Sequence, residues 1–345
     1  MTLGDDRGSD TPAGRKSVNR TPLLEAGLLF LRLGPAIGLV LLIVILSQLS
    51  PVFATPRNVG NLLAQSAVIC VLAIGQLLVI ITRGIDLSVG STLALGTVTG
   101  ALAYAAGFPT GIVIATMLVT GLLVGAINGI VYVYGRLPHP FIITLATLSI
   151  ARGLALVLSD GQPIQGMPEA VTALGGDTLF GWLPISTLLV AAIAGAALVL
   201  TVRMVWGRWI YAVGGNPEAA RRIGIPVSGT LVSVYLLSGL MAGVAALLTA
   251  GRTNAGAPTF GALAELDAIA AVVIGGASFL GGRGNIGNAI VGALMIGVIR
   301  NGMNILNVDA FFQPIVIGVV IVVAVELDVI RTRLEQRFRL MEALG

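Results

Sequence analysis

Charged side chains are scarce in this sequence. Its 345 residues include 20 Lys and Arg and 16 Asp and Glu, which is 10% of the chain, against roughly 25% in soluble domains. Hydrophobic residues make up 56% of the chain, and its mean hydropathy is +0.97. So few charges cannot coat a soluble globule, and the composition therefore excludes a soluble enzyme and indicates a membrane-embedded protein.

Cysteine, histidine and lysine each occur once, as Cys70, His139 and Lys16. A single cysteine excludes an intramolecular disulfide framework, and a single histidine excludes a His-rich metal site. Because the only lysine lies near the N-terminus, the chain has no phosphate-binding loop of the G-x-x-x-x-G-K-[ST] type. We predict no metal site and no catalytic residue in this chain, and Glu265 and Asp267 do not form a credible protease pair with Asp86.

Long apolar runs are what the sequence has instead. A membrane-spanning helix needs about 20 mainly apolar residues, and ten such segments can be found. The third, eighth and ninth are rich in glycine and adjoin polar breaks, which are typical of broken or re-entrant helices. The ten segments are Gly34 to Leu49, Val59 to Ile81, Leu87 to Ala106, Gly111 to Tyr134, Phe141 to Leu158, Leu183 to Val202, Ser228 to Ala250, Leu266 to Leu280, Ile286 to Leu306 and Gln313 to Ile330.

The basic residues predict how these segments are oriented, because Lys and Arg are retained on the cytoplasmic side of a membrane. With the N-terminus inside, 15 of the 20 basic residues fall in inner loops, and only Arg57 and Arg252 fall in outer loops. The other three, Arg32, Arg152 and Arg300, lie at or within helix ends and belong to neither count. We therefore expect an all-α polytopic bundle with both termini in the cytoplasm. Residues 1–22 are expected to be a disordered cytosolic tail, residues 23–333 a single transmembrane domain, and residues 334–345 a cytosolic C-terminal tail. The same pattern explains the basic charge better than nucleic-acid binding does.

Glycines spaced four residues apart predict close contacts between helices. Gly121, Gly125 and Gly129 share one helix face, and Gly239 and Gly243 repeat the spacing. Contact within the chain explains them better than a dimer interface. A third set spells G-x-G-x-x-G, but it joins two apolar helices instead of following a strand, so we expect tight turning and packing there and no dinucleotide. This third set is Gly282, Gly284 and Gly287.

A polar segment between the second and third apolar runs contains the first candidate site. It includes Gly84, Asp86, Ser88, Gly90 and Ser91. An ionisable side chain near membrane depth is costly and indicates a functional site by default. Asp86 either lines a translocation path or lies at the cytoplasmic interface, where it would pair with Arg83 and cap the third helix; the sequence leaves both open.

Arg152 is a second charge within an apolar run. We expect it to pair with a carboxylate or with helix carbonyls, and contact with a solute is the alternative.

The inner loop 203–227 contains a short helix with clear end signals. Asn216, Pro217 and Glu218 form an N-cap, a first-turn proline and a first-turn acid, and Gly224 ends the helix. An interfacial helix that places arginines among headgroups is one interpretation, and a contact for a cytosolic partner is the other. The candidate contact residues are Gly214, Gly215, Asn216, Pro217, Glu218, Ala219, Ala220, Arg221, Gly224 and Ile225.

Four stretches together resemble the permease subunit of ribose-type ABC importers. They are GIDLSVGS, PHPFIITLATLSIARGLAL, YAVGGNPEAARRIGI and IGGASFLGGRGNIGNAIVGALMIGVIRNGMNIL, and the resemblance runs from about residue 35 to about residue 330. It implies ten helices, a homodimer or a pair with a homologous permease in the bacterial inner membrane, and a periplasmic or lipid-anchored solute-binding protein. It also implies a cytosolic ATP-binding subunit that holds ATP and Mg²⁺ and contacts the helix within 216–225, so this chain itself needs no cofactor.

The function that follows is import of a monosaccharide or similar small polar solute by alternating access. The alternative is an ion-coupled secondary transporter in which Asp86 binds a proton or Na⁺ and no ATPase is needed. A membrane-embedded enzyme lacks a credible set of residues. The helix within 216–225 distinguishes the first two classes, because a solute symporter has no need of an ATPase contact.

Overall fold

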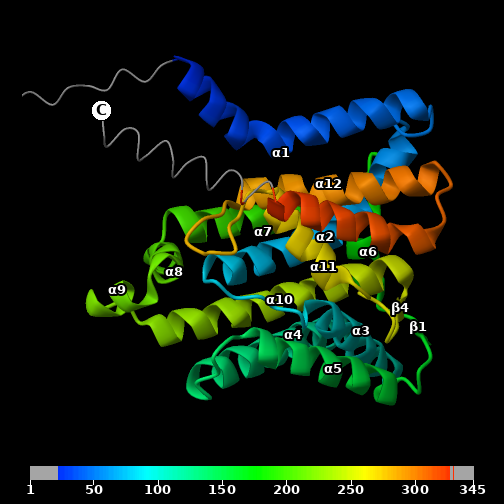
Figure 1. Cartoon of the computed structure of the whole chain (residues 1–345). Coiled ribbons are helices and arrows are strands. Elements are labelled where there is room, and N and C mark those ends of the chain that lie inside the picture. Colours follow the sequence, from blue (N-terminus) through cyan, green and yellow to red (C-terminus); the bar gives the residue numbers. More distant parts are fainter. Residues whose placement is uncertain (1–21, 327–328, 330–345) are drawn as a thin grey trace, which may run out of the picture.

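The part of the chain that the structure describes is mainly helical, with four very short strands (Figure 1). The computed structural model describes residues 22–326 and residue 329, and side-chain environments from residue 34 onward. The predicted terminal tails therefore lie outside the described residues, apart from residue 22. The helices are α1 (Pro22–Leu49), α2 (Pro56–Ile81), α3 (Val89–Ala105), α4 (Thr110–Tyr134), α5 (Phe141–Leu158), α6 (Glu169–Gly176), α7 (Ile185–Val202), α8 (Val205–Gly215), α9 (Pro217–Arg222), α10 (Val227–Thr253), α11 (Ala264–Ile274) and α12 (Ile286–Ile305).

The long helices run back and forth between two ends of the bundle (Figure 1). Helices α8 and α9 lie at one end, and α6 lies toward the other, where β1 (Ile164–Gln165) pairs with β4 (Ala255–Gly256) and β2 (Thr178–Leu179) pairs with β3 (Leu183–Pro184). A last apolar helical segment, Ala310–Glu326, begins with the 3-10 turn η1 (Ala310–Phe312). The described chain enters and leaves the bundle at the α9 end (Figure 1).

Helix α2 lies at the centre of the bundle. Its second half is almost entirely buried, and its apolar side chains form the main core with those of α10, α11 and α12. By contrast, α4, α5 and α7 expose rows of large apolar side chains such as Leu123, Leu154 and Leu198. Apolar side chains that point outward are expected where the solvent is lipid.

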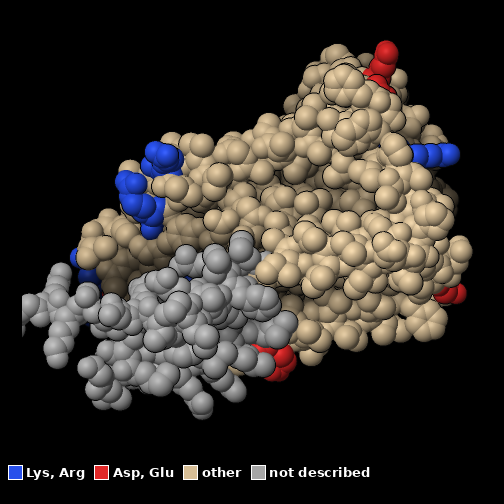
Figure 2. Space-filling model, turned by 90° about the horizontal axis from the view of Figure 1, so that it is seen from above, with Lys and Arg blue, Asp and Glu red and all other residues tan. Residues whose placement is uncertain are grey.

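Six of the described helices are long and apolar enough to cross a membrane, namely α2, α4, α5, α7, α10 and α12. Shorter apolar helices cover 34–49, 89–105 and 310–326. One face of the molecule has a broad middle zone without charge, with basic side chains gathered toward the α9 end (Figure 2). The predicted class, an all-α polytopic membrane protein, is confirmed.

Glycines let α4 and α10 lie in backbone contact. A Cβ added at Gly121 would press into the carbonyl oxygen of Gly239, and one added at Gly125 would press into that of Tyr235. Likewise, a Cβ at Gly243 would meet the backbone of Met117. The predicted contact within the chain is confirmed for these glycines, and also for Gly129, which lies against Val232 on α10.

The predicted apolar segments each overlap a helix, but the eighth segment, predicted to reach Leu280, is too long. Helix α11 ends at Ile274, because the chain turns at Gly276 and Gly281, both with positive φ. The inner loop contains α8 as well as the expected short helix, and the loop between α5 and α7 contains α6 and a small hairpin. The sequence missed these elements because they are too short for a strong periodic signal.

Candidate functional site

Two helix breaks within the bundle create the most unusual local structure of the chain. Residues 82–88 separate α2 from α3, and residues 254–263 separate α10 from α11. Helix α11 has only 11 residues, so at about 1.5 Å per residue it cannot cross a hydrocarbon layer of about 30 Å. Irregular backbone at membrane depth is tolerated only where protein buries it or a cavity lines it.

The two breaks meet where α3 begins. A Cβ added at Gly90 would press into the Gly261 carbonyl and the Glu265 carboxylate, and one added at Gly261 would meet the Gly90 backbone at 2.5 Å. The N-terminal ends of α3 and α11 are therefore brought together. Each end presents backbone N–H groups and a partial positive charge, so this meeting point can bind polar or negatively polarised groups.

Asp86 lies next to this meeting point and is only 1% exposed. Its Oδ1 accepts hydrogen bonds from the Ser88 backbone N–H at 3.0 Å and the Ser88 hydroxyl at 2.7 Å, and its Oδ2 accepts one from the Ser238 hydroxyl at 2.8 Å. The amide of Gln76, oriented to satisfy both groups, donates to the Asp86 carbonyl at 3.1 Å. The carboxylate is thus held between α10 and the start of α3.

The expected pair between Asp86 and Arg83 does not form. Arg83 instead donates to the carbonyl oxygens of Gly214 and Gly215, at the end of α8. The reason is geometric: Arg83 has a positive φ of 66°, and the chain turns at this residue. Asp86 does not cap α3 either: it accepts the N–H of Ser88, which is itself the N-cap residue, and Ser88 makes no side-chain capping bond.

A chain of polar side chains continues from Asp86 into the neighbouring helices. Asn128 donates to the Ser88 hydroxyl at 2.8 Å, and Thr147 donates to the Asn128 side-chain oxygen at 2.7 Å. The Thr144 hydroxyl donates to the Ile85 carbonyl at 3.1 Å. All three side chains are buried or nearly so, so the break at 82–88 is fixed by hydrogen bonds to α4, α5 and α10.

Arg152 reaches the second break from α5. Its Nη1 donates to the Phe260 carbonyl at 2.8 Å and also to the Pro258 carbonyl. Arg152 thus bonds to backbone carbonyls, which were the expected kind of partner, although they belong to a break and not to a helix. Both Arg152 and Glu265 are only partly buried on the surface of the single chain.

Two of the site residues were missed because the sequence gives no sign of their surroundings. Glu265 was considered only as part of a protease pair, yet it lies against Gly90. Ser238 carries no charge and sits within an apolar run, yet it binds Asp86. By contrast, Ser91 of the predicted set is fully buried, and its hydroxyl donates to the Ser88 carbonyl at 2.9 Å, so it only closes the first turn of α3.

A buried ion pair holds the start of α11 against α12. Arg300 donates to the carboxylate of Asp267 at 2.8 Å. Asp267 is buried, and Arg300 is mostly so. An unpaired charge at this depth is expensive, and the ion pair therefore fixes the position of α11.

The predicted short helix of the inner loop is present as α9. The Asn216 side chain accepts the N–H groups of Glu218 and Ala219, each at 3.0 Å, and Gly224 has a positive φ of 84°. Glu218 pairs with Arg221 at 3.1 Å, while Ala220 is buried beneath the helix. Pro217 and Ile225 are intermediate in exposure.

Ile223, which is not among the predicted contact residues, is 76% exposed at the end of α9. An exposed apolar side chain on a well-capped helix favours contact with a partner. Gly214, which is a predicted contact residue, is buried against the backbone of Ile81, so it packs within the chain.

The expected turning and packing role of the third glycine set is observed. Gly282 and Gly284 have φ values of 71° and 159°, and the Gly284 carbonyl accepts the Tyr211 hydroxyl at 2.8 Å. Partial burial raises the pKa of Tyr211, so burial favours the protonated form, in which the hydroxyl is a donor. Gly287 lies in the first turn of α12, against the side chain of the N-cap residue Asn285.

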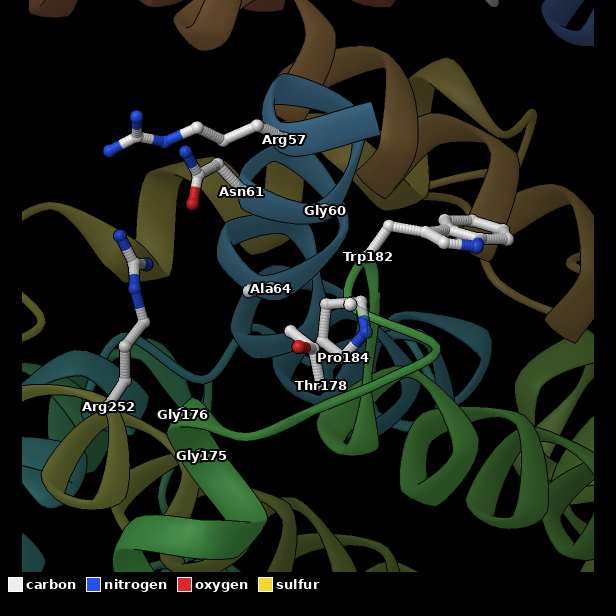
Figure 3. Close-up of a pocket in the computed structure, with 11 residues that line it drawn as sticks. Arg57, Gly60, Asn61, Ala64, Gly175, Gly176, Thr178, Trp182, Pro184 and Arg252 are labelled. Atoms are coloured by element: carbon white, nitrogen blue, oxygen red, sulfur yellow. The ribbon is translucent and has the colours of Figure 1, made fainter. Parts of the chain in front are cut away.

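A pocket of about 240 Å³ lies at the opposite end of the bundle, where α2 begins and α6 ends. Arg57, Asn61 and Arg252 extend along one side of it, Trp182 and Pro184 lie on another, and Gly175 and Gly176 form part of its wall (Figure 3). Neither guanidinium makes an ion pair or hydrogen bond with another described residue. These are the two arginines that the sequence places in outer loops.

A bundle of apolar helices with two polar breaks meeting inside it is the architecture of a membrane transport protein. Comparison with known proteins defines the family. Residues 58–325 match the family described as branched-chain amino acid transport system / permease component, and the chain belongs to this family of permeases. It is thus a multi-pass protein of the bacterial inner membrane.

Several characterised permeases are similar over most of their length. The ribose import permease protein RbsC of Bacillus subtilis (strain 168) is 41% identical over 86% of this chain and 92% of its own. The D-allose transport system permease protein AlsC of Escherichia coli (strain K12) is 40% identical over 84% of this chain and 89% of its own. The xylose transport system permease protein XylH of the same Escherichia coli strain is 34% identical over 80% of this chain and 86% of its own. No solved structure matches the chain.

Proposed function

We propose that the chain is the membrane-spanning permease subunit of an ATP-driven importer, and that its solute is a monosaccharide or a similar small polar molecule. The similar permeases carry ribose, allose or xylose in their names, which supports this solute class. The observation that carries the proposal is the meeting of the two helix breaks at Gly90 and Gly261. Broken helices that expose backbone groups near the middle of a bundle are typical of transport pathways.

The path itself is proposed to run past Arg152 and Glu265. Both side chains are partly exposed on the single chain, and charged groups facing lipid are expensive. A second copy of this chain, or a homologous permease, would cover them and leave a polar path between the two subunits. Hydroxyl groups of a sugar can accept from the guanidinium of Arg152 and donate to the carboxylate of Glu265.

The energy is proposed to come from a cytosolic ATP-binding subunit that contacts α9. Helix α9 is capped at both ends, and its exposed surface combines Ile223 with Glu218 and Arg221. In this arrangement ten helical segments lie in the membrane, of which α11 crosses only part of the hydrocarbon layer. The α9 end and both termini are cytoplasmic, and loop 203–227 is the coupling loop. ATP and Mg²⁺ would be bound by the partner subunit, and the permease would hold no cofactor.

The opposite end of the bundle is proposed to receive the solute-binding protein, either periplasmic or lipid-anchored. This end holds the pocket with Arg57 and Arg252 and the exposed hairpin tip at Phe180, which is 87% exposed. The chain between α5 and α7 also places three exposed acids at this end, namely Asp160, Glu169 and Asp177, and basic residues of the binding protein are their expected counterparts. The arginines of the pocket add positively charged groups on the same surface, so carboxylates of the binding protein are the expected counterparts.

Asp86 is proposed to be structural. Both of its carboxylate oxygens are occupied by hydroxyl or N–H donors, and the side chain is closed off from the surface. In the ion-coupled alternative, the same carboxylate would have to release its donors to bind Na⁺ or a proton. The capped helix α9 and the similarity to importer permeases favour the ATP-driven reaction.

A pair of variants at the two ends of the molecule tests these partner assignments. Ile223→Asp should abolish co-purification of the ATP-binding subunit in mild detergent, because it places a charge in an apolar contact, while the binding protein still binds. Phe180→Asp should have the opposite effect, because this side chain lies at the other end. Each variant is the control for the other, since each replaces one highly exposed apolar side chain by an acid.

One outcome would contradict the assignment of α9 as the contact for the ATP-binding subunit. An Ile223→Asp chain that retains the ATP-binding subunit and transports at the wild-type rate would exclude α9 as the contact.

A further inference from the structure

Arg83 connects the membrane bundle to the segment that leads into α9. Its Nε donates to the Gly214 carbonyl at 2.6 Å, and its Nη2 donates to the Gly215 carbonyl. Gly215 is the last residue of α8, and the next residue, Asn216, is the N-cap of α9. The side chain of Arg83 therefore contacts the chain immediately before the proposed coupling helix.

The backbone around this contact is packed without intervening side chains. Gly282 donates its N–H to the Ile81 carbonyl at 2.8 Å. A Cβ added at Gly214 would press into that same Ile81 carbonyl and lie 2.7 Å from the Gly282 nitrogen. We call the contact among Ile81, Arg83, Gly214, Gly215 and Gly282 the Arg83 junction. It joins the end of α2, the end of α8 and the turn before α12.

The charges of the junction are complementary. The last carbonyl groups of a helix carry partial negative charge, and the guanidinium of Arg83 donates to two of them at the end of α8. Hydrogen bonds from a charged donor are shorter and stronger than those between neutral groups. The junction therefore resists separation of α8 from α2 when a force acts on α9.

The break that contains Arg83 also connects the junction to the candidate translocation path. Arg83 and Asp86 belong to the same break, and Asp86 is fixed to Ser88 and Ser238. Helix α3 begins immediately afterwards, and its first turn contains Gly90, which touches the second break at Gly261. A displacement of α8 can therefore be transmitted to the meeting point of the breaks through the Arg83 hydrogen bonds and the few residues between Arg83 and Gly90.

We propose that Arg83 is the positioning residue that transmits movement of α9 to the break at 82–88 and so to the translocation path. This inference rests on the proposed function, in which an ATP-binding subunit moves α9. Arg83 contacts neither ATP nor solute, and it acts through the carbonyls of Gly214 and Gly215. Its loss should separate ATP hydrolysis from transport without preventing assembly of the subunits.

The first test measures the number of solute molecules imported per ATP hydrolysed by the complete importer in liposomes. Arg83→Gln should lower this ratio about tenfold, within the range typical of residues that couple distant sites, while the ATP-binding subunit still co-purifies. Arg83→Lys should restore only part of it, because an ammonium group cannot reproduce the two-pronged contact of a guanidinium. Arg208→Gln is the control: it removes a positive charge from α8, the helix that Arg83 contacts, and Arg208 is exposed and bonds to no other described residue.

A second pair of variants reaches the junction without changing charge. Gly214→Ala forces α8 away from Ile81 and should lower the same ratio, whereas Gly195→Ala on α7, where an added methyl group meets open space, should not. This pair decides the question if Arg83→Gln fails to assemble. Ratios for Arg83→Gln and Gly214→Ala equal to those of their controls would overturn the inference. Failure of the proposed function has a different signature, because the wild-type chain would then not retain an ATP-binding subunit at all.

Discussion

At the scale of single residues, buried polar groups in this protein differ in whether their hydrogen bonds are satisfied. Asp86 has a donor for each carboxylate oxygen, and Ser238 supplies the only one described for Oδ2. By contrast, the Tyr235 hydroxyl is buried against Gly84 without a partner among the described residues. Tyr235 and Ser238 lie about one turn apart on α10, so substitutions at these two residues allow a matched comparison.

Ser238→Ala should destabilise the protein by about 1–3 kcal/mol, because it leaves a buried carboxylate oxygen without its donor. Tyr235→Phe should cost nothing or stabilise slightly, because it removes a buried hydroxyl that makes no bond. Thermal unfolding in detergent measures both effects. A Ser238→Ala protein as stable as the wild type would show that Ser238 does not hold Asp86.

The sequence identified the chemical character of this site but not its contacts. Asp86 was recognisable because it is a lone acid in an apolar setting, and its neighbours at 88 and 90 are adjacent in the chain. Its partner Ser238 is 152 positions away, and the alignment of α10 with the break at 82–88 depends on tertiary packing. The contact of Glu265 with Gly90 could not be predicted for the same reason.

At the scale of helices, close approach of backbones determines how the elements pack. The glycine spacing predicted close helix contacts within the chain, and the structure shows that the two glycine sets meet each other, on α4 and α10. The spacing could not show that α2 is the central helix or that α11 stops at Ile274. Those features depend on which apolar faces of each helix are covered by neighbouring helices. Because nearly every helix of this chain is apolar on most of its faces, the sequence does not show which of them are covered.

Gly239→Ala should destabilise the protein by about 1–3 kcal/mol, the usual cost of overpacking, because the new methyl group would press into the backbone of Gly121 and Gly125. Gly229→Ala, on the same helix, meets open space and should raise stability by up to about 1 kcal/mol, since alanine favours a helix more than glycine does. Unfolding in detergent–lipid mixed micelles compares the two. Equal stabilities would mean that α4 and α10 are free to separate.

At the scale of the whole molecule, the two ends of the bundle are chemically distinct. The α9 end gathers basic side chains (Figure 2) and presents a capped helix with exposed Ile223, and the opposite end holds the pocket with Arg57 and Arg252 (Figure 3). The two helix breaks lie between these ends. This arrangement fits a protein that receives solute at one end and energy at the other.

The most direct test of this account asks what drives solute accumulation. The chain is reconstituted in liposomes either alone, with an imposed proton or Na⁺ gradient, or together with its ATP-binding subunit and solute-binding protein. We predict no accumulation by the chain alone, and ATP-dependent accumulation by the complete importer that persists when both ion gradients are collapsed. Gradient-driven accumulation by the chain alone, abolished by Asp86→Asn, would contradict the account and establish an ion-coupled transporter.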